Sequence, residues 1–484
     1  MKKILFLLFF AVNLLSAQTP IKIKLKSNKL FGSPSSSPFI QFSVEGDAMY
    51  SYVNADNPAI TGNGLMPSGT FYVDVPISGQ YIFSIVPSDQ FKLKFSTTQQ
   101  IVLEEKNSEA DRVLELSQWG NGQWKPNLNS MFKDCKNMII TATDIPNFSN
   151  VTNMNSMFWG FSQNLIPNIT SWNVSKVKDF SMMFAWSKFN TDLNGWNTAS
   201  ATNMYAMFSS ASVFNQNLDN WKTENVTNMS SMFSNATLFN GNISTWNTGK
   251  VTDMSNMFNN AEVFNNNVGN WKTNNVTFMY GMFKNAKSFN QNVSNWNVSK
   301  VYRFEEMFRK ASSFNQNIGS WQIYAVDPFT STPADLSMML DNSGLDCVKY
   351  GSTLQGWSQN SNIQRLIKIG VSGLKYNSNG KTFRDKLISS KNWQFNGDFH
   401  DPNCSELSVN DFNLDNIKIE NPASDRLNIQ NLDNIKRIEI YSTEGRLLKT
   451  LNKGQRNISE LTEGLYILKL FTSEKIITKK IIKK

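Results

Sequence analysis

Apolar positions recur about every 25 residues through the middle of the chain, from residue 127 to residue 357. Each copy carries a Met-Phe pair, and the phenylalanines of these pairs are Phe132, Phe158, Phe184, Phe208, Phe233, Phe258, Phe283 and Phe308. Tryptophans keep the same spacing at Trp172, Trp196, Trp221, Trp246, Trp271, Trp296 and Trp321. A unit this short cannot bury its apolar side chains alone, whereas stacked units bury them between neighbours. The period therefore predicts a solenoid of about eight or nine coils, with these aromatic residues as its spine.

Within one copy, Val226, Met229 and Phe233 fall at i, i+3 and i+7, which predicts one or two turns of helix there. The second half of each copy is expected to be extended. In the first copy, the β-branched Ile139 and Ile140 favour a strand. One position is asparagine in successive copies, at Asn215, Asn240, Asn265, Asn290 and Asn315. These asparagines are expected to stack and to hydrogen-bond along the solenoid through their side-chain amides.

The segments on either side of the repeats have a different pattern. Short β-rich runs between Gly, Pro and Ser turns predict one β-sandwich before the repeats and a second one at the C-terminal end. An irregular last copy and a predicted helix follow the regular repeats and are typical of a cap. The chain is thus expected to be mainly β with short helices. Its signal peptide, first sandwich, repeats, cap and second sandwich are expected at 1–17, 18–117, 118–323, 324–408 and 411–484.

The first 17 residues are typical of a secretory signal peptide. Lys2 and Lys3 form a basic start, and a nearly unbroken apolar run at residues 4–15 follows, too short to span a bilayer. Small residues precede the expected cleavage site between Ala17 and Gln18. The sequence has no later apolar run of about 18 residues, so no transmembrane span is predicted.

The formal net charge of +9 does not by itself indicate a nucleic-acid partner. The basic excess lies at the two ends of the chain, and residues 18–413 carry a net charge of only +2. Phosphate binding needs a basic stripe, and none is apparent in this body from the sequence. Binding of DNA or RNA is therefore not predicted.

Candidate catalytic residues are scarce. His400 is the only histidine, so any Ser-His-Asp or Cys-His site would have to use it, and a surface loop is the favoured interpretation. The sequence contains no phosphate-binding loop and no hydrolase motif, and nothing marks a glycosidase pair of carboxylates. Glu305 and Glu306 interrupt the repeat and are expected on a solvated face. We predict no enzymatic activity, no cofactor and no metal site.

The three cysteines are Cys135, Cys347 and Cys404. Cys347 and Cys404 could form a disulfide, which export favours, or bind zinc together with His400, although a closed zinc site needs a fourth ligand. Cys135 stands where other copies have alanine, so it is expected to be a small buried core residue.

The tryptophan series has two interpretations. Exposed aromatic faces in a row could stack on sugars, whereas buried ones would form part of the core. We favour the core, because each tryptophan recurs at the step of the other apolar positions.

The repeat "VTNMSSMFSNATLFNGNISTWNT" resembles that of the BspA-type leucine-rich-repeat surface proteins, which reads roughly "VTDMSSMFxxAxxFNQDISxWDTS". The resemblance implies a leucine-rich-repeat-like solenoid at the bacterial cell surface with adhesive roles, often preceded by a PKD-like β-sandwich. The aspartate of "FNQD" is retained only at Asp192 and is asparagine at Asn217, Asn242, Asn267, Asn292 and Asn317. This difference weakens any expectation of a calcium-binding carboxylate ladder.

The C-terminal segment is similar to the type A sorting domain of the type IX secretion system of Bacteroidota. The matching stretches are "NPASDRLNI", "IEIYSTEGRLLKTL", "ISELTEGLYILKL" and the closing "KKIIKK". The resemblance implies that the type IX machinery recognises residues 411–484 and that the protein becomes extracellular or anchored at the outer-membrane surface.

These observations together predict a secreted, surface-displayed repeat protein that binds macromolecules without catalysis. Its ligand would be an extracellular protein or a polysaccharide. Two alternatives remain: a structural spacer of the cell surface, or a polysaccharide-acting enzyme whose site lies in a flanking domain.

Overall fold

The computed structural model describes residues 18–28, 37–95, 108–404, 423–427, 429, 435–442, 446–472 and 476–483. The predicted signal peptide, Ala17 included, lies outside these residues. The chain forms two compact units, residues 1–404 and 405–484. Its described part is mainly β, with two α-helices.

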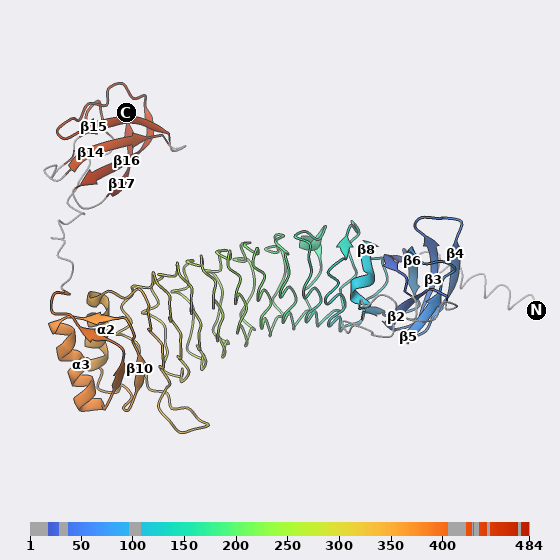
Figure 1. The fold of residues 1–484 in the computed structure, drawn as a ribbon, viewed down its shortest axis with the longest axis horizontal. Helices are drawn as coiled ribbons and strands as arrows, with labels where there is room; N and C mark the ends of the chain where they lie inside the picture. The colour runs from blue at the N-terminus through green and yellow to red at the C-terminus, as the bar shows by residue number, and fades with distance from the viewer. Residues whose placement is uncertain are drawn as a thin grey trace, which may run out of the picture. The chain divides into compact units, whose positions relative to one another are not determined.

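The first unit begins with two sheets, shown at the blue end of Figure 1. One has six strands in the order β4-β3-β6-β1-β8-β9, and the other has three in the order β5-β2-β7. Their bounds are β1 Ile21–Lys26, β2 Phe39–Glu45, β3 Ala48–Asn54, β4 Thr61–Met66, β5 Gly69–Asp74, β6 Gln80–Pro87, β7 Lys92–Lys94, β8 Val113–Gln118 and β9 Ile139–Ile140. Buried side chains alternate along β1, and Phe42 of β2 packs 4.9 Å from Phe83 of β6 between ring centroids. The inner faces of the two sheets therefore share one core.

The first repeat is joined directly to the larger sheet. Strand β9 pairs in parallel with β8, through Glu115 with Ile139 and Leu116 with Ile140. The short 3-10 helix Ala110–Arg112 precedes β8, and a second, Ile169–Ser171, lies within an early repeat. The sheet thus provides the end surface on which the first coil packs.

Successive repeats lie side by side as a stack of coils between the N-terminal sheets and the C-terminal helices (Figure 1). One parallel bridge joins each coil to the next, at Asn127, Asn153, Asp179, Asn203, Asn228, Asp253, Phe278, Arg303 and Asp335. From Asn127 to Arg303 each bridging residue is about one 25-residue copy beyond the last, so the sequence period is the physical step of the stack; the step to Asp335, in the irregular last copy, is longer.

The helix predicted from Val226, Met229 and Phe233 is absent, and the segment is a run of turns. Alternate backbone N–H groups bond to the next coil: Ser231 donates to the Ser255 carbonyl at 2.8 Å and Phe233 to Met257 at 2.9 Å. The N–H groups between them close short turns within the same coil, as the N–H of Met232 does by donating to the Met229 carbonyl. An α-helix directs all its N–H groups along its own axis, so it cannot supply these bonds between coils. The three apolar residues are all buried, as their spacing predicted. The backbone that buries them consists of turns bonded to the next coil and not of a helix.

Left-handed residues make this alternation possible. In one coil they are Ser231 and Asn235, with φ of 56° and 58°. The same two positions are left-handed in the neighbouring coils, where they carry Ser, Asn, Gly or another residue. Asparagine tolerates this conformation better than most residues, which is one reason why the repeat is rich in it.

Three columns of buried aromatic rings fill the stack. The Met-Phe phenylalanines from Phe132 to Phe308 stack with centroids 5.5–5.9 Å apart. The tryptophans from Trp172 to Trp296 stack at 6.2–6.5 Å. A third column consists of Phe189, Phe214, Phe239, Phe264, Phe289 and Phe314, all buried. Each coil therefore covers the rings of the one before it.

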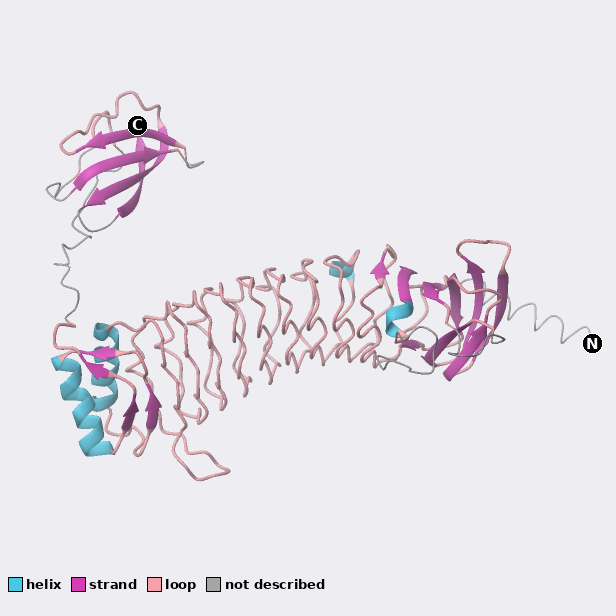
Figure 2. Cartoon of the chain, viewed as in Figure 1, coloured by secondary structure: helices cyan, strands magenta, loops and turns pink. Residues whose placement is uncertain are grey.

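The C-terminal end of the stack is covered by two helices, drawn in cyan in Figure 2. The elements are α2 Cys347–Gln359, α3 Ser378–Lys391, β10 Lys368–Gly370, β11 Lys375–Tyr376, β12 Gln394–Asn396 and β13 Phe399–His400. Leu336 bridges in parallel to Ile369, and β10 pairs in parallel with β12, so the coil step continues beneath the helices. The side chain of Asp346 accepts the N–H of Lys349 and caps α2.

The second unit contains a four-stranded antiparallel sheet in the order β15-β14-β16-β17. Its strands are β14 Ile435–Tyr441, β15 Leu447–Asn452, β16 Gly464–Thr472 and β17 Ile476–Lys483. Ile438 and Ile440 of β14 and Leu468 and Leu470 of β16 are buried in a separate apolar core. This unit therefore has its own core.

Candidate binding surface

One column of asparagines forms a hydrogen-bonded ladder along the stack. The backbone N–H of each donates to the Oδ1 atom of the asparagine one coil before it, at 2.8–2.9 Å for Asn215, Asn240, Asn265, Asn290 and Asn315. The prediction that these asparagines bond to one another through their side-chain amides was wrong. The donor of each bond is a backbone N–H group, and only the acceptor is a side-chain amide oxygen. Four of these asparagines, from Asn215 to Asn290, are exposed, and their Nδ2 groups donate to no acceptor in the described part of the chain. The stack therefore presents a regular row of free amide donors.

The second asparagine of "FNQN" has a local role. Oδ1 of Asn267 accepts the N–H of Gly269 at 2.9 Å, and Oδ1 of Asn292 accepts that of Ser294 at 2.9 Å. Asp192, the one aspartate in this column, makes the same turn with Asn194. A neutral amide oxygen and a carboxylate serve this turn equally well. Among the residues that the structure describes, no three His, Cys, Asp or Glu side chains are grouped to hold a metal ion.

The repeat tryptophans lie in the core. None from Trp172 to Trp321 is more than 4 % exposed. From Trp196 onward each indole N–H donates to a backbone carbonyl of the preceding coil, as Trp246 does to Leu218 at 2.8 Å. Their faces stack on one another and offer no surface to a sugar.

Two other tryptophans lie outside this buried column. Trp186 is 65 % exposed, and its ring lies 6.5 Å from that of the half-buried Trp159 on the neighbouring coil. Nζ of Lys133 lies 5.0 Å from the ring centre of Trp159. Sequence analysis missed this pair, although the signal was present: these tryptophans fall outside the 25-residue tryptophan series.

Glu305 and Glu306 are buried, which overturns their expected place on a solvated face; only 6 % and 5 % of their surfaces are exposed. Burial raises the pKa of Glu306, but hydrogen bonds and charge from Lys284 and Arg309 outweigh it, so this pKa lies below its ordinary value. Burial raises the pKa of Glu305 above its ordinary value despite the guanidinium of Arg303, 2.5 Å away. The two carboxylates are thus buried and paired with the more exposed basic side chains of Lys284, Arg303 and Arg309, which is a structural role.

The cap contains the candidate cysteines. Cys347 and Cys404 form a disulfide with Cα atoms 6.2 Å apart, so neither supplies a thiolate to zinc in this structure. His400 is exposed on β13, with its ring 5.6 Å from that of Tyr376. Cys135 is fully buried, and burial raises the pKa of its thiol well above the ordinary value, as suits a core residue.

The cap contains a buried polar cluster that the sequence did not predict. Arg384 donates to both carboxylate oxygens of Asp398, at 2.8 and 2.9 Å, and the Tyr350 hydroxyl donates to Asp398 at 2.8 Å. Burial, followed by the charge of Asp398, raises the pKa of Tyr350 well above its ordinary value. The cluster ties α2, α3 and the segment before β13 together, which is a structural role.

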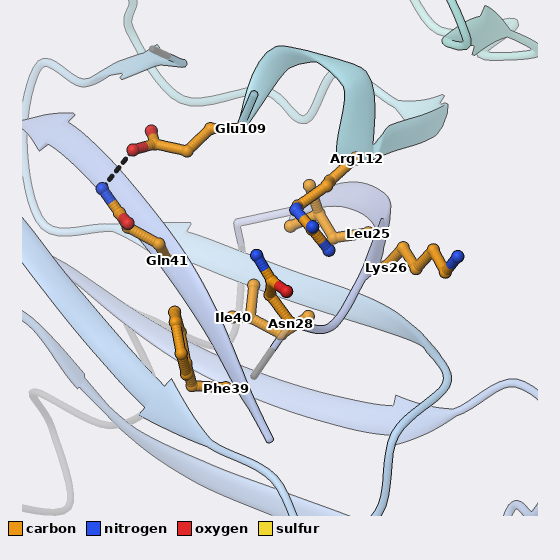
Figure 3. A pocket seen from close by; sticks show the side chains of 8 residues that line it. All are labelled: Leu25, Lys26, Asn28, Phe39, Ile40, Gln41, Glu109 and Arg112. Atoms are coloured by element: carbon orange, nitrogen blue, oxygen red, sulfur yellow. Dashed lines mark hydrogen bonds between the residues drawn. The ribbon is translucent and has the colours of Figure 1, made fainter. Parts of the chain in front are cut away.

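The N-terminal sheets contain two hollows, which are the candidate places for an enzyme site in this flanking part of the chain. The first, shown in Figure 3, has a volume of about 20 Å³, and its lining includes Gln41, which donates to Glu109, and Arg112, which donates to the Ser27 carbonyl at 2.8 Å. That volume holds about one water molecule. The second is open, about 550 Å³, and lined mainly by apolar and neutral residues such as Met49 and Leu65. Among the described residues that line it there is no carboxylate and no histidine for acid-base catalysis.

Two family models match parts of the chain. One, described as a Mycoplasma protein of unknown function, DUF285, matches residues 126–245 and 227–342. The other, described as a secretion system C-terminal sorting domain, matches residues 421–484. The protein is exported. Comparison with curated proteins gives no match.

The matched sorting domain lies within the second compact unit, residues 405–484. The exported protein thus carries a type IX sorting signal on a unit with a core of its own. In the described part of the chain, no helix is long and apolar enough to cross a membrane.

Proposed function

We propose that the protein is displayed at the cell surface as a non-catalytic binding protein, and that the exposed edges of its coils contact an extracellular protein or polysaccharide. The resemblance to BspA-type leucine-rich-repeat proteins supports an adhesive role. The sorting domain provides the route to the surface. The repeat stack provides the contact area.

The observation that carries this proposal is the row of exposed asparagine amides from Asn215 to Asn290. Their Oδ1 atoms are held by the next coil, so the side chains are oriented before any ligand arrives. Each amide contact is weak, but equivalent contacts repeated along one rigid stack add through multivalency. A surface of this kind suits a ligand that itself repeats.

Binding of the purified chain, residues 18–484, to an array of glycans, extracellular-matrix proteins and bacterial envelope fractions tests this proposal. The informative variant lacks residues 226–275, two coils. This deletion removes two whole copies and keeps the alternation of lysine and asparagine across the junction, because Asn297 takes the place of Asn247 in the coil after Lys222. We expect saturable binding that weakens in the deletion variant.

The outcomes separate the candidate functions. Binding that is unchanged by the deletion places the contact outside the stack. A folded protein that binds nothing favours a structural spacer. Degradation of an array polysaccharide, lost on substitution of a carboxylate in a flanking domain, favours an enzyme.

A further inference from the structure

Lysine and asparagine alternate at two positions along one edge of the stack. These positions are the first and the fourth residues after each repeat tryptophan. The pairs are Asn173 and Lys176, Lys222 and Asn225, Asn247 and Lys250, Lys272 and Asn275, and Asn297 and Lys300; two coils lack lysine there, the one with Asn197 and Ser200 and the last, with Gln322 and Ala325. We call Lys176, Lys222, Lys250, Lys272 and Lys300 the lysine row; all five are exposed.

Neutral partners hold part of the lysine row in place. Nζ of Lys250 donates to Oδ1 of Asn225 on the preceding coil at 2.7 Å, and Lys300 does the same to Asn275 at 2.8 Å. Asn225 in turn donates through Nδ2 to the Ala199 carbonyl at 2.9 Å. These amide oxygens orient the ammonium groups and carry no charge. The lysines are therefore positioned without being neutralised.

Other lysines on the stack are paired with carboxylates. Lys284 pairs with Glu306 at 2.5 Å, and Lys287 pairs with Glu262 at 2.9 Å. In contrast, no member of the lysine row forms an ion pair within the part of the chain that the structure describes. Glu224 is the one exposed carboxylate at the first to fourth positions after the repeat tryptophans. The stack thus has an edge of positive charge that no nearby carboxylate neutralises. This edge is not apparent from the net charge of residues 18–413, which is only +2.

We propose that the lysine row binds a linear anionic polysaccharide, with a carboxylate on its sugars, that lies along the axis of the stack. This inference rests on the proposed binding function. Adjacent coils that pair like parallel strands are about 4.8 Å apart, so positive charges recur along the axis at intervals of one or two coils. A polymer with regularly spaced carboxylates can contact several lysines at once.

The residues between the lysines favour a sugar polymer over a nucleic acid. The exposed neighbours include Asn247, Asn297, Thr227 and Thr252, which offer amides and hydroxyls to sugar hydroxyl groups. Single-stranded nucleic acids are bound through aromatic side chains that stack on the bases. In this row the neighbouring exposed residues are small and polar instead.

The test compares two triple variants of the chain, residues 18–484. K222Q/K250Q/K272Q removes three consecutive members of the lysine row. K188Q/K287Q/K386Q removes the same charge from exposed positions outside it. The probe is polygalacturonate, a linear polyuronate, with neutral dextran and double-stranded DNA for comparison. We expect wild-type binding to polygalacturonate that weakens with added salt, and a loss of about tenfold in the row variant only.

Equal losses in the two variants would overturn the proposal, since they would report net charge alone. Tighter binding of DNA than of polygalacturonate, or equal binding of dextran, would overturn the choice of ligand. If polygalacturonate does not bind but another member of the array does, the lysine-row inference fails and the proposed function stands. If no array member binds and the protein is folded, both fail. Circular dichroism of each variant verifies the fold.

Discussion

Hydrogen bonding distinguishes otherwise similar tryptophans in the buried column. Trp246 donates its indole N–H to the Leu218 carbonyl, whereas the N–H of Trp172, equally buried, meets no acceptor in the described structure. Both rings stack on a neighbouring tryptophan. The two positions therefore differ in this hydrogen bond, and also in their ring neighbours, since Trp172 packs edge-to-face on Trp119 and Phe148.

Replacing each of these tryptophans by phenylalanine should expose that difference. Both variants lose ring volume, but only Trp246→Phe loses a hydrogen bond, so it should cost about 1 kcal/mol more than Trp172→Phe. Urea unfolding followed by circular dichroism measures both. Trp186→Phe, at an exposed position, is the control and should leave stability unchanged. Equal losses at Trp246 and Trp172 would contradict the assigned bond.

Glu305 and Glu306 should affect stability with opposite pH dependence. The pKa of Glu306 is lowered from 4.5, so its contribution is present above that pH and is lost as the pH falls through the folded-state value. The pKa of Glu305 is raised from 4.5, so the folded state favours its protonated form and loses stability as the pH rises through the folded-state value.

Substitution by glutamine tests this assignment. Glu306→Gln should lower stability by about 1–3 kcal/mol at pH 7, with the loss shrinking as the pH falls below the ordinary carboxyl range. Glu305→Gln, compared with the wild type, should become more favourable as the pH rises. Thermal unfolding between pH 3 and pH 7 provides the two profiles, and parallel profiles would refute the assignment.

At the scale of elements, the cap depends on a buried ion pair. The carboxylate of Asp398 is fully enclosed, and the guanidinium of Arg384 is largely so. Rings of Tyr376 and Phe395 lie 5.1 and 4.8 Å from that guanidinium. Removing the carboxylate would leave a buried positive charge without its partner.

We expect Asp398→Asn to destabilise the cap by about 3–5 kcal/mol, because breaking a buried pair leaves one charge uncompensated. The matched control is Asp385→Asn, whose partner Lys381 is exposed on the same helix. That exposed pair should contribute nothing measurable. Thermal unfolding with the Cys347–Cys404 disulfide intact compares the two, and similar melting temperatures would argue against the cluster.

At the scale of the molecule, folding and export are assigned to different units. The first unit has its own extensive core, and the sorting domain lies wholly in the second. Deleting residues 405–484 should therefore leave the first unit folded and prevent its appearance at the cell surface. Protease accessibility on intact cells, with fractionation, measures this. Surface exposure of the truncated chain would show that residues 405–484 are dispensable for export.

Much of the architecture could be predicted from the sequence, because a stacked repeat places equivalent residues in columns. The spacing of Phe233 and Trp246 from their copies is the spacing of rings that stack in the structure. The small residue expected at Cys135 is buried for the same reason. The C-terminal segment could also be predicted, because it carries a sorting motif that a family model matches.

What the sequence determined by itself is therefore which residues repeat and in which order, since a period is visible without coordinates. Only the tertiary structure decided how neighbouring coils are bonded. It replaced the expected helix with turns, made the backbone N–H of Asn240 the donor to Asn215, buried Glu306 and aligned Lys250 with Asn225. All of these features depend on contacts between residues about one coil apart in the chain. Local patterns report on one copy, whereas hydrogen bonds and burial here are properties of two adjacent copies.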